Sequence, residues 1–187
     1  MVMFVLLTML TTTAVWLVVE RKHGILRRLA SSPISRVSIV TGKCGSRLGL
    51  GAVQISFAMI TGAVLFRVRW GPNLWAILVV LAAYAALAVS AAVLLGSLAR
   101  SEGQVIGIGV VASNLLGALG GCWWPIEITP RWAQKLAILL PTGWAMDALH
   151  KLISFGDSPS AVIPHFAALL AAALVLGAIA VRRFRFE

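Results

Sequence analysis

The sequence predicts an all-α fold: a polytopic membrane bundle of five transmembrane helices, with a cytoplasmic interfacial helix and an outer-side re-entrant helical hairpin. Composition is the first reason. Of the 187 residues, 60% are hydrophobic and 12% are charged, whereas soluble domains have about 25% charged residues. The mean hydropathy is +0.96. The apolar residues are also grouped in blocks long enough to cross roughly 30 Å of hydrocarbon.

Five apolar segments have the length of about 20 residues that a membrane-crossing helix needs. Their interiors lack Asp, Glu, Lys and Arg, which are costly inside a bilayer. The first has no basic region before it and no small-residue cleavage site, so we expect a span and not a cleaved signal peptide. The predicted spans are Val2–Val19, Leu48–Phe66, Asn73–Leu98, Gln104–Cys122 and Ala161–Val181.

The positive charges predict the orientation of these spans. The formal net charge is +10, and cytoplasmic segments of membrane proteins collect Lys and Arg. If five spans alternate, eleven basic residues lie on the side of the 20–47 loop and the C-terminus, and five lie on the other. This excess places loop 20–47 and the C-terminus in the cytoplasm. The expected outer interface then carries Trp70, Trp75, Trp123, Trp124 and Trp132, as an aromatic belt does.

Residues 20–32 are predicted to form an amphipathic helix at the cytoplasmic interface. At 100° per residue, Ile25, Leu26 and Leu29 lie on one arc and the arginines lie opposite. Pro33 disfavours helical geometry at the residue before it and so ends the helix. Such a helix can anchor to anionic lipid or dock on a cytoplasmic partner, and the residues alone leave both alternatives open.

The apolar segment 123–155 is interrupted by Pro125, Pro130 and Pro141. Irregular backbone at membrane depth needs cover from protein or water, so we expect a re-entrant or interfacial helical hairpin. Elsewhere, glycines recur at G-x-x-x-G spacing, which lets membrane helices approach closely. Packing within the chain is the expected role, with a subunit interface as the alternative. The pairs are Gly45/Gly49, Gly103/Gly107 and Gly117/Gly121.

No catalytic, metal or nucleotide site is predicted. The stretch TGKCGS at 41–46 fails the Walker A pattern, because Val37 and Cys44 occupy positions that need Gly and Ser or Thr. The histidines have no ligands at metal-binding spacing. The spans offer Gln54, Ser113 and Asn114, with no group to activate a nucleophile. These polar side chains are candidates for a translocation path, and hydrogen bonding between helices is the alternative.

One motif carries a resemblance. The pattern E-R-x-x-G-x-L-x-R-L-x-x-x-P, followed by Gly42-Lys43, resembles the transmembrane permease subunits of ABC transporters of the type 2 exporter class. A second block around 125–156, which includes DALHKLISFG, is similar to the outer hairpin of that family. The positions that match the motif are Glu20, Arg21, Gly24, Leu26, Arg28, Leu29 and Pro33.

The resemblance implies one permease domain over 1–187, without an ATPase site or a cofactor of its own. It implies that 20–33 couples this chain to ABC ATPase subunits, which bind ATP and Mg, and that a second permease copy or homologue completes a dimer. Exported drugs, antibiotics, lipids or other amphiphiles are the implied cargo, in a bacterial plasma membrane. Nucleic acid is not an expected partner, whereas membrane lipids are.

Two features depart from the family. Family members often have an acidic residue at Lys22, Thr at Ile25 and Glu at Arg27, so the interfacial helix here is more basic. The family also has a span before the one that opens this sequence, so we expect a truncated or fragmentary permease. The alternative function is a non-transporting membrane scaffold whose basic helix binds anionic lipid.

Overall fold

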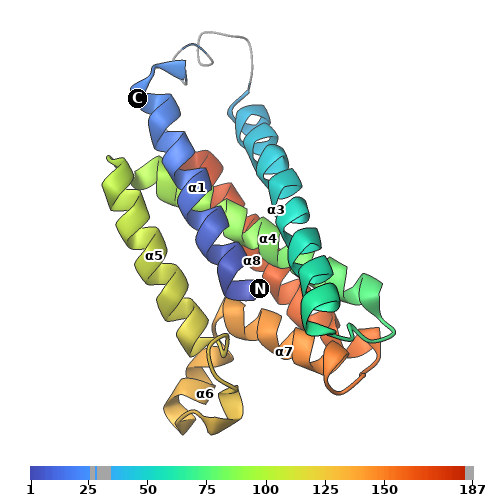
Figure 1. Ribbon diagram of the computed structural model, residues 1–187. Coiled ribbons are helices and arrows are strands. Elements are labelled where there is room, and N and C mark those ends of the chain that lie inside the picture. The colour runs from blue at the N-terminus through green and yellow to red at the C-terminus, as the bar shows by residue number, and fades with distance from the viewer. Residues whose placement is uncertain (26–27, 29–34, 184–187) are drawn as a thin grey trace.

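The computed structural model describes residues 1–25, 28 and 35–183 (Figure 1). Within these ranges the regular structure is helical and no strand occurs. Short 3₁₀ helices cover Ile126–Ile128 (η1) and Pro159–Val162 (η2). The α-helices are α1 (Val2–Lys22), α3 (Arg36–Phe66), α4 (Leu74–Leu98), α5 (Glu102–Leu119), α6 (Arg131–Ala137), α7 (Pro141–Ile153) and α8 (Ile163–Arg183).

Among the described residues, five helical segments are long and apolar enough to cross a membrane, which confirms the predicted fold class. These segments alternate in direction (Figure 1). The end of α1, the start of α3, the α4–α5 connection and the end of α8 therefore lie together at one end of the bundle. We call this the charged end. The short helices α6 and α7 lie at the opposite end.

The first two spans are longer than predicted from hydropathy. Helix α1 continues through Lys22, and α3 begins at Arg36 and not at Leu48. The Oγ atom of Ser35 accepts a hydrogen bond from the N–H of Ser38 at 3.1 Å, which caps the start of α3. The additional first turns of α3 contain lysine, arginine and glycine. Hydropathy does not identify these turns as part of a span, because such residues lower the mean hydropathy of the segment.

Helix α5 ends at Leu119, before the predicted boundary at Cys122. Gly121 has a φ of +80°, which is a left-handed conformation suited to glycine. The N–H of Cys122 donates to the carbonyl of Gly117 at 2.9 Å. This pattern is a helix C-cap that satisfies a terminal carbonyl. The left-handed conformation of Gly121 therefore ends the helix and turns the chain away from its axis.

Helix α4 is the centre of the bundle. It packs on α1, α3, α7 and α8 and is buried over most of its length, whereas few residues of α3 and α8 are buried. Small residues permit this packing. A Cβ atom on Gly96 would lie 2.9 Å from Cβ of Leu17 and 3.0 Å from the carbonyl of Ala14. The backbones of α1 and α4 therefore approach each other closely at the charged end.

Helix α5 packs on α1 by the same means. A Cβ atom on Gly109 would meet Cγ2 of Thr11 at 2.7 Å, and one on Gly117 would meet Cγ of Met3 at 2.7 Å. The predicted close packing of G-x-x-x-G glycines is thus found at Gly117. In the described part of the chain, nothing lies within 4 Å of the corresponding positions at Gly45, Gly49, Gly103 and Gly107.

The segment after α5 forms the helical elements η1, α6 and α7, each of which begins at a proline. Pro125 and Pro130 precede η1 and α6, and Pro141 occupies the first turn of α7, where its missing N–H costs no hydrogen bond. The Oγ1 atom of Thr142 donates to the carbonyl of Leu116 at 2.7 Å and fastens α7 to the end of α5.

The five tryptophans of the predicted aromatic belt lie in or beside helix ends at this opposite end. Trp75, Trp123, Trp124 and Trp132 are exposed, and Trp70 is half-buried and donates to the carbonyl of Met59 at 3.2 Å. The end of α3, the start of α4, the end of α5 and α6 lie on this side of the bundle (Figure 1), and each of these tryptophans is in or beside one of them. Exposed amphipathic rings are typical of a membrane–water interface, and the aromatic belt itself stays a prediction.

Candidate functional site

The last turn of α1 joins the helices of the charged end. Glu20, Arg21 and Lys22 are consecutive, and successive side chains of an α-helix project about 100° apart. Each one therefore faces a different neighbour. Glu20 forms an ion pair with Lys43 of α3, and both side chains are about four-fifths buried. Removing one partner would leave the other charge poorly solvated, so this pair holds α1 against α3.

Arg21 binds the end of α4. Its Nη2 atom donates to the carbonyl of Gly96 at 2.8 Å and to that of Ser97 at 3.3 Å, and its Nη1 atom donates to the carbonyl of Ala99 at 3.0 Å. The last carbonyls of a helix have no partner within the helix and carry the negative end of its dipole. The guanidinium of Arg21 donates hydrogen bonds to these carbonyls and places a positive charge at the negative end of the dipole. Arg21 of α1 therefore caps the C-terminus of α4.

Lys22 binds the start of α5. Its Nζ atom lies 2.7 Å from Oε1 of Glu102, and both side chains are about half exposed. Glu102 stands in the first turn of α5, where a carboxylate also favours the helix dipole. The Oγ atom of Ser101 accepts from the N–H of Gln104 at 3.2 Å and caps the same helix. Lys22 thus joins α1 to a well-formed helix start.

The chain leaves α1 directly after these contacts. Gly24 has a φ of +69°, which is a left-handed conformation, and its N–H donates to the carbonyl of Arg21 at 3.1 Å. Beyond this turn, Ile25 is exposed and the N–H of Arg28 donates to the carbonyl of Gly24 at 3.2 Å. Glu20 and Arg21 therefore belong to α1, and the predicted separate helix can begin only after Gly24.

Three predicted coupling residues, Leu26, Leu29 and Pro33, lie outside the described residues. The others have clear places: Glu20 and Arg21 bind helices of the same chain, Gly24 makes the turn, and Arg28 is exposed after it. The sequence pattern therefore marks two adjacent features. One is a junction of four helices, and the other is the segment that emerges from it.

The predicted path residues do not converge. The Oε1 atom of Gln54 on α3 accepts from Oγ1 of Thr8 on α1 at 3.1 Å. Ser113 is fully buried on α5, and its Oγ atom has no partner within the described chain. The Nδ2 atom of Asn114 donates to the carbonyl of Val110 in its own helix at 2.8 Å. Gln54 thus acts between helices, and Asn114 acts within its own.

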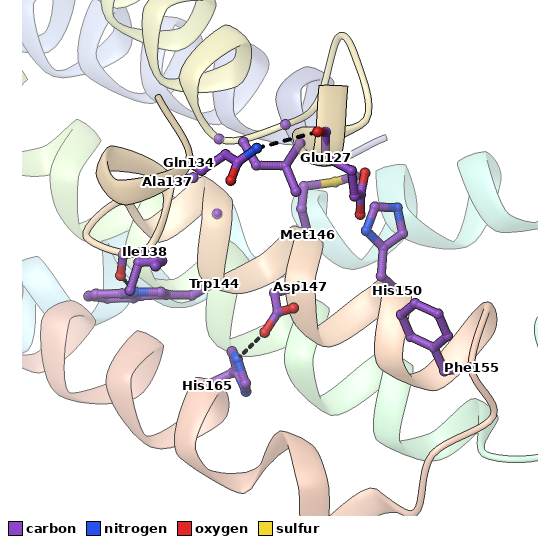
Figure 2. Close-up of a pocket in the computed structure, with 14 residues that line it drawn as sticks. Glu127, Gln134, Ala137, Ile138, Trp144, Met146, Asp147, His150, Phe155 and His165 are labelled. Carbon is purple, nitrogen blue, oxygen red and sulfur yellow. Dashed lines mark hydrogen bonds and ion pairs between the residues drawn. The ribbon is translucent and has the colours of Figure 1, made fainter. Parts of the chain in front are cut away.

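A second polar cluster lies at the opposite end, and sequence reasoning missed it. The Oδ2 atom of Asp147 on α7 accepts from Nζ of Lys151 at 2.8 Å and from Nε2 of His165 on α8 at 2.6 Å. Figure 2 shows the imidazole of His165 turned toward this carboxylate. The i,i+4 spacing of Asp147 and Lys151 was a visible signal, whereas the approach of His165 needs the fold.

The cluster lowers the pKa of Asp147. Partial burial by itself raises the pKa of this carboxyl, but the hydrogen bonds and charges of Lys151 and His165 outweigh it. Asp147, His165 and Glu127 also line a cavity of about 430 Å³ (Figure 2). Over the described ranges, no group of three or more His, Cys, Asp and Glu residues has a metal-binding arrangement.

These features define a multi-pass integral membrane protein with a charged helix junction at one end and a cavity lined by polar and apolar residues at the other. Its sequence matches the profile of the family described as ABC-2 family transporter protein over residues 1–182. The chain belongs to this family, and the predicted membership is confirmed.

Two relatives illustrate the similarity. The linearmycin resistance permease protein LnrN of Bacillus subtilis (strain 168) is 27% identical over 184 residues, which are 98% of this chain and 47% of that protein. The inner membrane transport permease YhhJ of Escherichia coli (strain K12) is 26% identical over 173 residues, which are 90% of this chain and 46% of that protein. The chain spans about half the length of these relatives. No solved structure is significantly similar to it.

Proposed function

We propose that this chain acts as the membrane-spanning permease domain of an ATP-driven exporter, with residues 20–33 as its contact to a separate ABC ATPase. Membership of the ABC-2 family and the permease names of its relatives support transport. The observation that carries the coupling role is the junction beside this segment, where Glu20, Arg21 and Lys22 bind α3, α4 and α5.

The junction supports a mechanical route for coupling. A force on the segment after Gly24 reaches α1 first, because the turn at Gly24 directly continues from that helix. The ion pair of Glu20 and the hydrogen bonds of Arg21 pass the force to α3 and α4, and Lys22 passes it to α5. Closure of an ATPase dimer around ATP and Mg would thus move four helices together.

The position of the charges supports an external energy source. Glu20, Lys43 and Glu102 lie near the charged end, and His165 begins the last span at the other end. Machines driven by protons or voltage place ionisable groups inside the membrane. In this proposal the ATPase partner binds and hydrolyses ATP, and the permease, paired with a second copy or homologue, forms the path.

Co-purification with the ATPase tests the contact. We expect the Leu26→Asp/Leu29→Asp variant to lose the ATPase subunit, because two carboxylates replace the apolar side chains that would fill a groove on the partner. The matched control is Ile128→Asp/Leu139→Asp, which changes two exposed apolar residues at the opposite end and should retain the ATPase. Unchanged co-purification of the Leu26/Leu29 variant would show that the coupling assignment is wrong.

The transported compound is identified on the complex of this chain with its ATPase. The measurement is the rate of ATP hydrolysis in the presence of each candidate compound. We expect stimulation by amphiphiles such as drugs, antibiotics or lipids, in keeping with the resistance permease among the relatives. If no ATPase co-purifies and the chain instead binds anionic liposomes in a manner lost at high salt, the scaffold function replaces the transport function.

A further inference from the structure

The cavity at the opposite end has the size and lining of a ligand site. It measures about 430 Å³ and lies among the end of α5, η1, α6, α7 and the start of α8. Pockets for small molecules measure roughly 300–1,000 Å³ and combine apolar walls with a few polar groups. This cavity fits both criteria, and it lies away from the junction that the proposed coupling uses.

The charges at the cavity favour a cation. Two carboxylates line it, those of Glu127 and Asp147. The ammonium of Lys151 neutralises Asp147, whereas Glu127 takes part in no ion pair within the described part of the chain. The carboxylate of Glu127 is therefore available to a cationic ligand. The cations of the neighbouring helix α6, Arg131 and Lys135, do not line the cavity.

The apolar wall favours a hydrocarbon or aromatic body. Trp144, Met146 and Phe155 line the cavity, and Phe155 is 74% exposed. Figure 2 shows these side chains around the same space as Glu127 and His165. Aromatic faces attract cations as well as apolar groups, so the wall can hold an alkyl chain close to a charged head group.

We propose that this cavity binds amphiphilic primary amines, with the ammonium paired to Glu127 and the apolar body packed on Trp144, Met146 and Phe155. The biological meaning of such binding, as recognition of cargo or of an amine-bearing lipid, rests on the proposed permease function. The binding itself requires no ATPase, so the two proposals can fail separately.

Calorimetric titration of the chain in lipid nanodiscs tests this site, with octylammonium chloride as the probe and empty nanodiscs as the blank. We expect saturable binding of octylammonium and none of octanoate, which has the same chain and the opposite charge. Glu127→Gln should weaken octylammonium binding by about tenfold or more, as expected for a lost charge-assisted contact. Asp157→Asn removes a carboxylate at the same end, outside the cavity, and should leave the affinity unchanged.

Phe155→Ala is a second test variant. It should leave the stability of the fold unchanged, since the ring is largely exposed. It should weaken octylammonium more than butylammonium, because only the longer chain reaches the apolar wall. Equal binding of octanoate, wild-type affinity in Glu127→Gln, or no saturable octylammonium signal would each overturn the site. Co-purification of the ATPase would be unaffected by these results.

Discussion

The Nη2 atom of Arg21, in the last turn of α1, donates a hydrogen bond to the carbonyl of Gly96 in α4 at 2.8 Å. At the same level, the absent side chain of Gly96 leaves room for Leu17 and Ala14 of α1. The two helices are therefore joined at Gly96 by both a polar contact and an apolar contact. This relationship holds the charged end of the bundle together.

Arg21→Ala should destabilise the bundle, because it leaves carbonyls at the end of α4 without their charged donor. We expect a loss of about 1.5–3 kcal/mol, the usual contribution of hydrogen bonds to a charged group, and a lower melting temperature in detergent. The matched control is Arg100→Ala, which removes an exposed guanidinium at the same end of the bundle and should change stability little. Equal effects of the two variants would contradict the capping role.

Gly96→Ala should also destabilise the protein, by about 1–3 kcal/mol, because the new methyl group would overlap Leu17 and the backbone of Ala14. Gly49→Ala is the matched control, since its Cβ position is open. In a helix interior, this control should be neutral or stabilising by about 0.5–1 kcal/mol. Thermal unfolding of both variants measures the difference, and a neutral Gly96→Ala would show that α1 and α4 can separate at no cost.

Charge reversal tests the Lys22–Glu102 pair. Lys22→Glu places two carboxylates together and should cost about 1 kcal/mol or less, because the pair is half exposed and screened by solvent. Glu102→Lys should cost somewhat more, because it also places a positive charge at the start of α5, and the double reversal should recover the part of the stability that comes from the ion pair itself. A double-mutant cycle by chemical denaturation measures the coupling. The effect of each single variant should shrink in high salt, and a coupling that does not respond to salt would argue against an ionic contact.

The lowered pKa of Asp147 predicts a loss of stability in acid. A carboxyl whose pKa is lower in the folded state contributes its stability above the pKa of the unfolded state. That contribution disappears as the pH falls through the folded pKa. The melting temperature of the wild type should therefore fall below about pH 4 more steeply than that of Asp147→Asn. Asp157→Asn is the control and should follow the wild type, whereas identical profiles for Asp147→Asn and the wild type would exclude this contribution.

Hydropathy and charge predicted much of the fold because they act locally. A run of about 20 apolar residues must be a helix in a bilayer, whatever its neighbours are. Prolines at 125, 130 and 141 marked interruptions of an apolar segment, and the short helices begin at them. The boundary of α3 was the exception, because its capped first turns are held by contacts such as that of Lys43 with Glu20 and not by hydrophobicity.

By itself, the sequence determined a bundle of helices long and apolar enough to cross a membrane and the motif at 20–33, since each depends on residues close together in the chain. The tertiary structure decided which partners these residues bind. Lys22 meets Glu102 and His165 meets Asp147 only after separate helices pack, and Gly96 and Gly117 differ from Gly49 only in what lies opposite them. Contacts of this kind depend on the relative rotation and depth of whole helices, which the local pattern of residues does not specify.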